Sequence, residues 1–337
     1  MPNALCTSSL ARLLAIATVV AGCATTATTA ADSEGAPRKL IVATTVAPIT
    51  SIVAGIVGDR ATVTGIIPEG TNSHTFEPKP SVAELLSVAD VVYLNGLSLE
   101  DPTRQLAEGN LAKGSDIVQL GNLAIPASEY IYDFSFPKEG GKPNPHLWTD
   151  PTLARRYAEL VRDDMSQRDP DNATYYAANF DTFSTQVRQL DAAMRSAFAT
   201  IPQRVLLTYH DAYAYFAKSY GWNIIGAIQI DDFEDPTPSA VADLIDQIRS
   251  TGVPAIFGSE VFPSPVLAQI GKEANVRYVD ELRDDDLPGA PGDPQHSWLG
   301  LMRFDYITMT EALGGDATAL RNFQLDSVVP DESTYPQ

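Results

Sequence analysis

Histidine is the residue type through which this sequence most clearly offers chemistry. The 337-residue chain contains four histidines, and three of them, His74, His146 and His210, fall in loops at or near the ends of predicted strands. Asp280 ends a further predicted strand, and successive members of this set are 72, 64 and 70 residues apart. A lone loop histidine usually has no special role, but recurrence at equivalent places indicates a shared site. Three imidazoles and one carboxylate form a suitable tetrahedral shell for Zn²⁺, so we predict a metal site at these four residues.

The predicted shell is filled by protein ligands, which argues for holding a metal ion rather than using it in catalysis. A catalytic zinc site keeps an open position for water, and the sequence has no His-Glu-x-x-His motif. We therefore expect a binding protein and no enzyme. A zinc hydrolase and a surface adhesin whose metal only stabilises the fold stay open as alternatives. Asp280 has the alternative of a solvated surface acid, and His296, at the start of a predicted helix, is assigned no site role.

Composition limits the partners of the chain. Hydrophobic residues make up 44% of the sequence, which is ordinary for a globular protein. The formal net charge of −20 argues against broad binding of nucleic acid or anionic membranes. The two cysteines, Cys6 and Cys23, both precede the predicted domains. We therefore expect no disulfide and no thiolate metal site in the domains, so that histidines and carboxylates must hold any metal.

The N-terminal segment has the features of an export signal. Residues 1–22 contain Arg12, a short apolar run and then small residues, which is typical of a secretory signal peptide. Residues 20–23 (VAGC) match the bacterial lipobox, in which Cys23 is acylated and becomes the new N-terminus. The alternative is ordinary cleavage nearby, which would leave an unused thiol. We expect lipidation of Cys23 and a flexible tether over residues 23–38, whose small and polar side chains offer little surface to pack.

Strand and helix patterns alternate on both sides of the middle of the chain. Such alternation predicts an α/β fold with parallel sheets, in which ligands bind at the carboxyl ends of the strands. We expect an N-terminal lobe over residues 39–171, a C-terminal lobe over residues 202–326 and a frayed tail over residues 327–337. Strands are predicted at residues 40–43, 61–67, 91–94, 204–208, 223–228, 255–258 and 276–279. Helices are predicted at residues 48–57, 81–89, 212–220, 239–250, 265–274 and 296–313.

One long amphipathic segment separates the two lobes. Between residues 175 and 199, which include no Gly or Pro, apolar residues recur every three or four positions, at Tyr176, Phe180, Phe183, Val187, Leu190, Met194 and Ala197. This spacing predicts a helix with one apolar face, and breaker and cap residues on both sides place a linker helix at residues 172–201. A rigid helix between the lobes puts the site in the inter-lobe cleft. It also favours small shifts, or ordering of the aromatic loop 130–142, over wide closure.

Five stretches of the sequence together resemble one known family. They are, in order within residues 39–315, GTNSHTFEPKPS, NPHLWTDP, LLTYHDAYAYFAKSYG, YVDEL and WLGLMR. They look like the motifs of the metal-binding lipoproteins of bacterial zinc and manganese ABC importers, the cluster A-I substrate-binding proteins. The resemblance implies two α/β lobes joined by a single long helix, with the metal between them. It places ligands at the same four residues, His74, His146, His210 and Asp280.

The third of these motifs bears on the identity of the metal. Manganese members of the family often have Glu at the position of His210, while zinc members usually have His, so the resemblance implies Zn²⁺, with Mn²⁺ as the alternative. The long His-rich loop that many zinc members carry near residues 124–142 is absent. Glu77, Asp211 and Glu260 also match family positions, where they would either orient the ligands or cap turns and helices. Whether Glu260 or a water completes the shell stays open.

The resemblance also implies what the protein does. The chain would bind a divalent transition metal ion, which we expect to be zinc, with high affinity outside the cytoplasm. It would deliver this ion to the permease of a membrane ABC importer. We expect a monomer that is held at the outer face of the bacterial cytoplasmic membrane only by its lipid anchor. A manganese-specific binding protein and a metal-stabilised adhesin are the main alternatives, and a zinc hydrolase has the least support.

Overall fold

The computed structural model describes residues 38–227, 237–259, 265–325 and 333–335. Residues Lys39–Gln337 form one compact unit. The expected signal peptide, Cys23 and Glu260 lie outside the described residues. The fold described below is therefore that of the compact unit.

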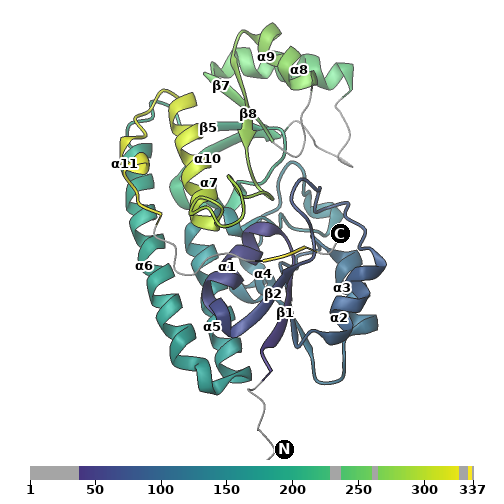
Figure 1. The fold of residues 1–337 in the computed structure, drawn as a ribbon. Helices are drawn as coiled ribbons and strands as arrows, with labels where there is room; N and C mark the ends of the chain where they lie inside the picture. The colour runs from purple at the N-terminus through teal and green to yellow at the C-terminus, as the bar shows by residue number, and fades with distance from the viewer. Residues whose placement is uncertain (1–37, 228–236, 260–264, 326–332, 336–337) are drawn as a thin grey trace, which may run out of the picture. The chain divides into compact units, whose positions relative to one another are not determined.

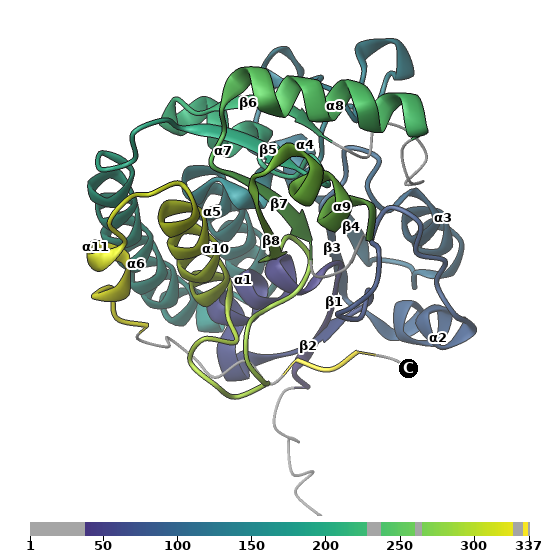
Figure 2. The ribbon, with the colours of Figure 1, turned by 90° about the horizontal axis from the view of Figure 1, so that it is seen from above.

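Two four-stranded parallel sheets form the framework of this unit (Figures 1 and 2). The first has the strand order β2-β1-β3-β4 and the second has the order β6-β5-β7-β8. The strands are β1 (Leu40–Thr44), β2 (Ala61–Gly65), β3 (Val91–Leu94), β4 (Asp116–Gln119), β5 (Val205–Thr208), β6 (Asn223–Ala227), β7 (Ala255–Ser259) and β8 (Arg277–Leu282). The predicted α/β class with two parallel sheets is confirmed.

Helices connect the strands and cover the sheets. They are α1 (Ala47–Val57), α2 (Pro80–Val88), α3 (Asp101–Asn110), α4 (Leu120–Ala124), α5 (Pro151–Arg168), α6 (Ala173–Phe198), α7 (Ala214–Tyr220), α8 (Pro238–Thr251), α9 (Pro265–Ala274), α10 (Trp298–Ala312) and α11 (Thr318–Arg321). Each predicted helix appears near its expected bounds, whereas α3, α4, α5, α11 and strand β4 are absent from the prediction. None of the helices in the described ranges combines the length and the apolar composition needed to cross a membrane.

Helix α5 begins at a well-formed cap. The Oδ1 atom of Asp150 accepts hydrogen bonds from the backbone N–H groups of Thr152 (2.7 Å) and Leu153 (3.3 Å). Pro151 occupies the first turn, where its missing N–H is not needed. The side chains that α5 buries recur every three or four positions, and they include Ala154, Tyr157, Ala158, Val161 and Met165. The prediction lacks this helix, although its cap and its apolar spacing are visible in the sequence.

The predicted linker helix is α6. The seven apolar residues that define its predicted face are all buried. Helix α6 contacts α1 and α5, which lie on the side of the first sheet, and α10 and α11, which follow the second sheet (Figure 1). At about 1.5 Å per residue, helix α6 is long enough to reach along both sheets. A single helix therefore joins the two halves of the unit.

The two halves also share a hydrophobic core. The larger cluster of buried apolar side chains takes in β1, β3, α5, α6, α10 and parts of β5 and β7, while a smaller cluster lies among β5, β7, α8 and α9. Two tryptophans add hydrogen bonds between distant segments. Nε1 of Trp148 donates to the backbone carbonyl of Asp284 (2.8 Å), and Nε1 of Trp298 donates to that of Trp148 (2.9 Å). Shared burial and these bonds oppose a wide hinge motion.

Residues 333–335 pair with the first sheet, which differs from the expectation of a frayed tail. They lie along the free edge of the first sheet, where the backbone N–H of Gly65 donates to the carbonyl of Thr334 (2.8 Å) and Thr334 bridges to Thr64. A Cβ atom on Gly65 would lie 2.1 Å from Cε1 of Tyr335. Glycine at position 65 therefore allows the Tyr335 ring to lie against the strand. The rest of the tail lies outside the described residues.

We expect Trp148→Phe to destabilise the protein by about 1–3 kcal/mol, because the buried carbonyl of Asp284 would lose its donor. Trp222→Phe is the matched control, since it also replaces a buried indole, but one whose Nε1 has no hydrogen-bond partner among the described residues. Urea unfolding of the purified proteins measures both changes. Equal destabilisation by the two substitutions would show that the bond from Trp148 contributes nothing beyond ring size.

Candidate metal centre

Three histidine rings meet near the carboxyl ends of the strands. His74 lies in the loop between β2 and α2, His146 lies shortly before α5, and His210 follows β5. The Nε2 atom of His146 lies 3.1 Å from that of His74 and 2.9 Å from that of His210. One nitrogen from each ring lies within 4.8 Å of the other two. The structure thus brings together the three histidines that the sequence placed in one site.

The three imidazoles are held in their neutral form. His146 and His210 are buried, and His74 is partly exposed. Burial lowers the pKa of His210 to about 3. Burial also lowers the pKa values of His146 and His74 well below their usual range, and the neighbouring His210 adds to both shifts, because like charges so close would repel. Neutral imidazoles present the nitrogen lone pairs that bind metal ions.

An asparagine two residues before each of two site histidines supports its loop. Oδ1 of Asn144 accepts hydrogen bonds from the backbone N–H of His146 (3.0 Å) and from its ring Nδ1 (2.9 Å). Oδ1 of Asn72 accepts from the backbone N–H of His74 (2.9 Å). Asn144 is absent from the predicted site. The repeated pattern Asn-x-His is the sequence signal that could have identified it.

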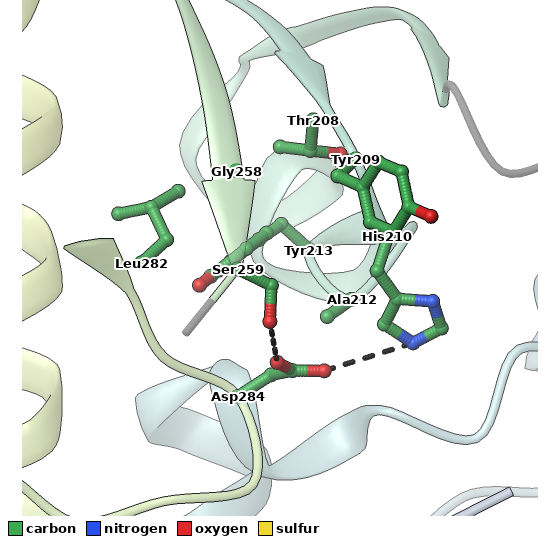
Figure 3. A pocket seen from close by; sticks show the side chains of 9 residues that line it. All are labelled: Thr208, Tyr209, His210, Ala212, Tyr213, Gly258, Ser259, Leu282 and Asp284. Atoms are coloured by element: carbon green, nitrogen blue, oxygen red, sulfur yellow. Dashed lines mark hydrogen bonds and ion pairs between the residues drawn. The ribbon is translucent and has the colours of Figure 1, made fainter. Parts of the chain in front are cut away.

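The structure does not bring Asp280 to the histidines. Asp280 lies within β8 and its side chain is exposed, whereas Val279 and Leu282 of the same strand are buried. Because β8 continues three residues beyond its predicted end, its carboxyl end falls later in the chain than expected. The carboxylate at that place belongs to Asp284, whose Oδ2 lies 3.6 Å from Nε2 of His210 (Figure 3). Among the described residues, the acid beside His210 is therefore Asp284 and not Asp280, and neither acid belongs to the group of three histidines that lies within 4.8 Å.

His210 and Asp284 line a small pocket at the ends of β5, β7 and β8 (Figure 3). Oγ of Ser259 donates to Oδ1 of Asp284 (3.3 Å), and Figure 3 shows the other oxygen pointing to the His210 ring. The residues that line the pocket are Thr208, Tyr209, His210, Ala212, Tyr213, Gly258, Ser259, Leu282 and Asp284. The two oxygens of Asp284 thus have different partners.

Buried acids surround this side of the site. Burial raises the pKa of Asp285 to about 7 and the pKa of Asp305 to about 8. Burial also raises the pKa of Asp284 well above its usual range, and the nearby Asp285 is the next cause. Such shifts mean that the ionised forms are poorly compensated by their surroundings. A divalent cation beside the histidines would stabilise the ionised form of Asp284.

The aromatic loop at residues 130–142 covers the histidines. The ring centroid of Phe136 lies 5.7 Å from those of His74 and His146 and 6.4 Å from that of His210. One phenyl ring thus packs against all three imidazoles. It keeps water from this side of the cluster and contributes to the burial that holds the rings neutral.

The other polar residues singled out from the sequence stand outside the cluster. Glu77 is exposed. Asp211 is buried, and burial followed by the nearby carboxyl of Asp133 raises the pKa of Asp211 well above its usual range. His296 is buried, with its Nε2 atom 4.0 Å from Oε2 of Glu69. The fourth histidine is therefore separate from the three that meet.

Comparison with known proteins places this chain in a family. The family model described as zinc-uptake complex component A, periplasmic, matches residues 42–312. The chain is 28% identical over 306 residues to the manganese-binding lipoprotein MntA of Halalkalibacterium halodurans, covering 89% of this chain and 96% of the relative. It is 30% identical over 313 residues to the iron-binding protein YfeA of Yersinia pestis, covering 91% and 98%. A manganese-bound mutant of a periplasmic metal-binding protein from Candidatus Liberibacter asiaticus has a similar structure, with a TM-score of 0.72 at 26% identity over 82% of this chain and 100% of that chain.

These matches agree with the fold and with the motifs. The family model spans both sheets and all three histidines of the cluster. The relatives are named as binding proteins and not as enzymes, which confirms that part of the prediction. Their names differ in the metal, since manganese and iron appear beside the zinc of the family description. The chain belongs to the zinc-uptake complex component A family, the metal-binding extracytoplasmic components of ABC importers.

Proposed function

We propose that this chain binds a divalent transition metal ion, with zinc preferred, and delivers it to the permease of an ABC importer. His74, His146 and His210 would each supply a ring nitrogen, and Asp284 would supply an oxygen. The observation that carries the proposal is the convergence of three Nε2 atoms, with neighbours 2.9 and 3.1 Å apart. Neutral imidazoles gathered this closely are best satisfied by one shared cation.

The donor set supports zinc over manganese. Three nitrogens and one oxygen suit tetrahedral Zn²⁺, whereas Mn²⁺ prefers oxygen donors and a higher coordination number. Ser259 holds Oδ1 of Asp284 while Oδ2 faces His210. This division of the two oxygens supports binding through one of them, and so a shell of four protein ligands.

Manganese is the second candidate. The similarity to the manganese-binding lipoprotein MntA extends over most of both chains. A rotation of Asp284 that let both of its oxygens bind would raise the coordination number and favour manganese. The number of carboxylate oxygens on the metal is therefore the property that separates the two candidates.

Metal binding would strengthen contacts that already join the loops of the two halves. The loop after β2 carries His74, and the loop after β8 carries Asp284. Backbone N–H groups donate to carboxylates across these loops in three places: Gly70 to Asp286 (2.7 Å), Ser73 to Asp285 (3.3 Å) and Leu287 to Glu69 (2.8 Å). Loading and release would therefore involve small loop adjustments, which the permease would have to recognise.

Zinc should raise the melting temperature of the wild-type protein, because a ligand at 100 times its dissociation constant adds about 2.7 kcal/mol of stability. His210→Ala and Asp284→Asn should each lose most of this rise. His296→Ala and Asp280→Asn are the matched controls, a buried histidine outside the cluster and an exposed acid of β8, and both should keep it. Thermal unfolding with and without Zn²⁺ measures the four variants. A full zinc-induced rise in melting temperature in His210→Ala, or loss of that rise in Asp280→Asn, would contradict this ligand set.

In competition titrations of metal-free protein at fixed pH, Zn²⁺ should bind more tightly than Mn²⁺. His210→Glu should narrow the difference between the Zn²⁺ and Mn²⁺ affinities, because an oxygen donor replaces a nitrogen donor. His296→Glu should leave it unchanged. Manganese binding as tight as zinc binding in the wild type would reject the zinc preference and leave metal binding itself intact.

We also propose that Cys23 carries a lipid anchor on the outer face of the cytoplasmic membrane. The lipobox at residues 20–23 and the lipoprotein name of the relative MntA support it. Cys23→Ser should move the protein from the membrane fraction to the soluble fraction, and Cys6→Ser should not. Fractionation and immunoblotting measure the distribution. Retention of Cys23→Ser in the membrane fraction would place the anchor elsewhere.

A further inference from the structure

Asn144 lies where the metal centre, the aromatic loop and the second half of the unit meet, and it is fully buried. Its backbone N–H donates to the carbonyl of Ile131 (2.9 Å), and its own carbonyl accepts from the hydroxyl of Tyr215 (3.1 Å). Its side-chain Nδ2 donates to Oδ2 of Asp133 (2.8 Å) and to the backbone carbonyl of Asp211 (2.7 Å). The polar groups of this residue are thus all engaged.

The orientation of the Asn144 amide is fixed by two backbone groups whose roles cannot change. Nδ2 meets the carbonyl of Asp211, which can only accept, and Oδ1 meets the N–H of His146, which can only donate. A flipped amide would set oxygen against oxygen and N–H against N–H. Oδ1 is therefore the atom that lies 2.9 Å from Nδ1 of His146.

This orientation determines the tautomer of His146. Because Oδ1 of Asn144 can only accept, Nδ1 of His146 must carry the ring proton. The lone pair of the neutral ring is then on Nε2, the atom that lies close to Nε2 of His74 and of His210. The hydrogen bond to Asn144 also prevents the ring from turning away from them.

We propose that Asn144 is a positioning residue for the metal centre. It selects the His146 tautomer whose Nε2 can bind a metal ion. Through its hydrogen bonds to Asp133 and Asp211 it also connects the loop that carries Phe136 and the turn after His210 to the His146 ring. This inference rests on the proposed function and adds to it a residue that does not touch the metal. A hydrogen-bond partner behind a metal-binding histidine typically changes metal affinity by about 10–100-fold when it is removed.

Two substitutions separate the two parts of this role. Leucine has a similar size but neither accepts a hydrogen bond from His146 nor donates one to the loop. Asn144→Leu should therefore lose both the control of the His146 tautomer and the hydrogen bonds to Asp133 and Asp211. Asn144→Asp keeps an acceptor oxygen for His146 but loses the donor that meets Asp133 and Asp211. Asn72→Ala is the matched control, because Asn72 supports the loop of His74 through its backbone N–H and does not contact His146.

Three measurements on the purified full chain test the proposal. Long-range ¹H–¹⁵N correlation of the metal-free protein should show the proton of His146 on Nδ1 in the wild type, in Asn144→Asp and in Asn72→Ala, but not in Asn144→Leu. Titration with Zn²⁺ alone should show affinity about 10–100-fold lower in Asn144→Leu. Trypsin cleavage after Lys138 should be faster in both Asn144 variants, because the loop has lost its donor.

The wild-type spectrum decides the question even if a variant fails to fold. A proton on Nε2 of His146 in the metal-free wild type would overturn the proposal. A folded Asn144→Leu variant that bound zinc as tightly as the wild type would also overturn it. A wild type with the expected tautomer that bound neither Zn²⁺ nor Mn²⁺ would instead overturn the proposed function, and with it the role of Asn144 toward a metal.

Discussion

The contact between three uncharged imidazoles is the constraint on which the rest of the structure depends. Their nitrogens lie as close as 2.9 Å, so the rings must stay neutral and each must be held in place by its own surroundings. The three rings must first be brought together from distant parts of the chain. Parallel sheets do this, because they gather loops at the carboxyl ends of strands that are far apart in sequence. Helix α6 and the shared core then keep the two sheets in a fixed relation, without which the loops could not meet.

The sequence was informative about the histidines and misleading about the acid. His74, His146 and His210 could be placed because each lies in a loop at or near the end of a predicted strand, so that its place in the topology hardly depends on exact boundaries. Asp280 was harder, because the end of β8 is set by its pairing with β7. That pairing shifts register between Phe257 and Ser259, and nothing in the sequence of β8 alone reveals the shift. The run of acids after it reads as a solvated surface, and only the folded chain shows Asp284 and Asp285 buried.

The seven-residue face of α6 was predictable because its apolar period continues over many turns and contains no competing signal. The omission of α5 has a different cause. Its cap residue Asp150 lies in a stretch that stands out as a motif, and its four arginines dilute the apolar period. The repeated Asn-x-His pattern could have drawn attention to Asn144, but its full role depends on partners near residues 131, 211 and 215. Long-range hydrogen bonds of this kind leave little trace in local sequence.

The short segment that lies against Gly65 bears on how the molecule meets copies of itself. An uncovered edge strand offers a row of backbone donors and acceptors to any passing extended chain. In this protein the carbonyl of Thr334 already accepts from the edge, and the Tyr335 ring fills the space above Gly65. Thr334 and Tyr335 thus cover part of one edge of the chain's own sheet. Crowding would therefore offer less opportunity for strand exchange between neighbouring molecules at this edge.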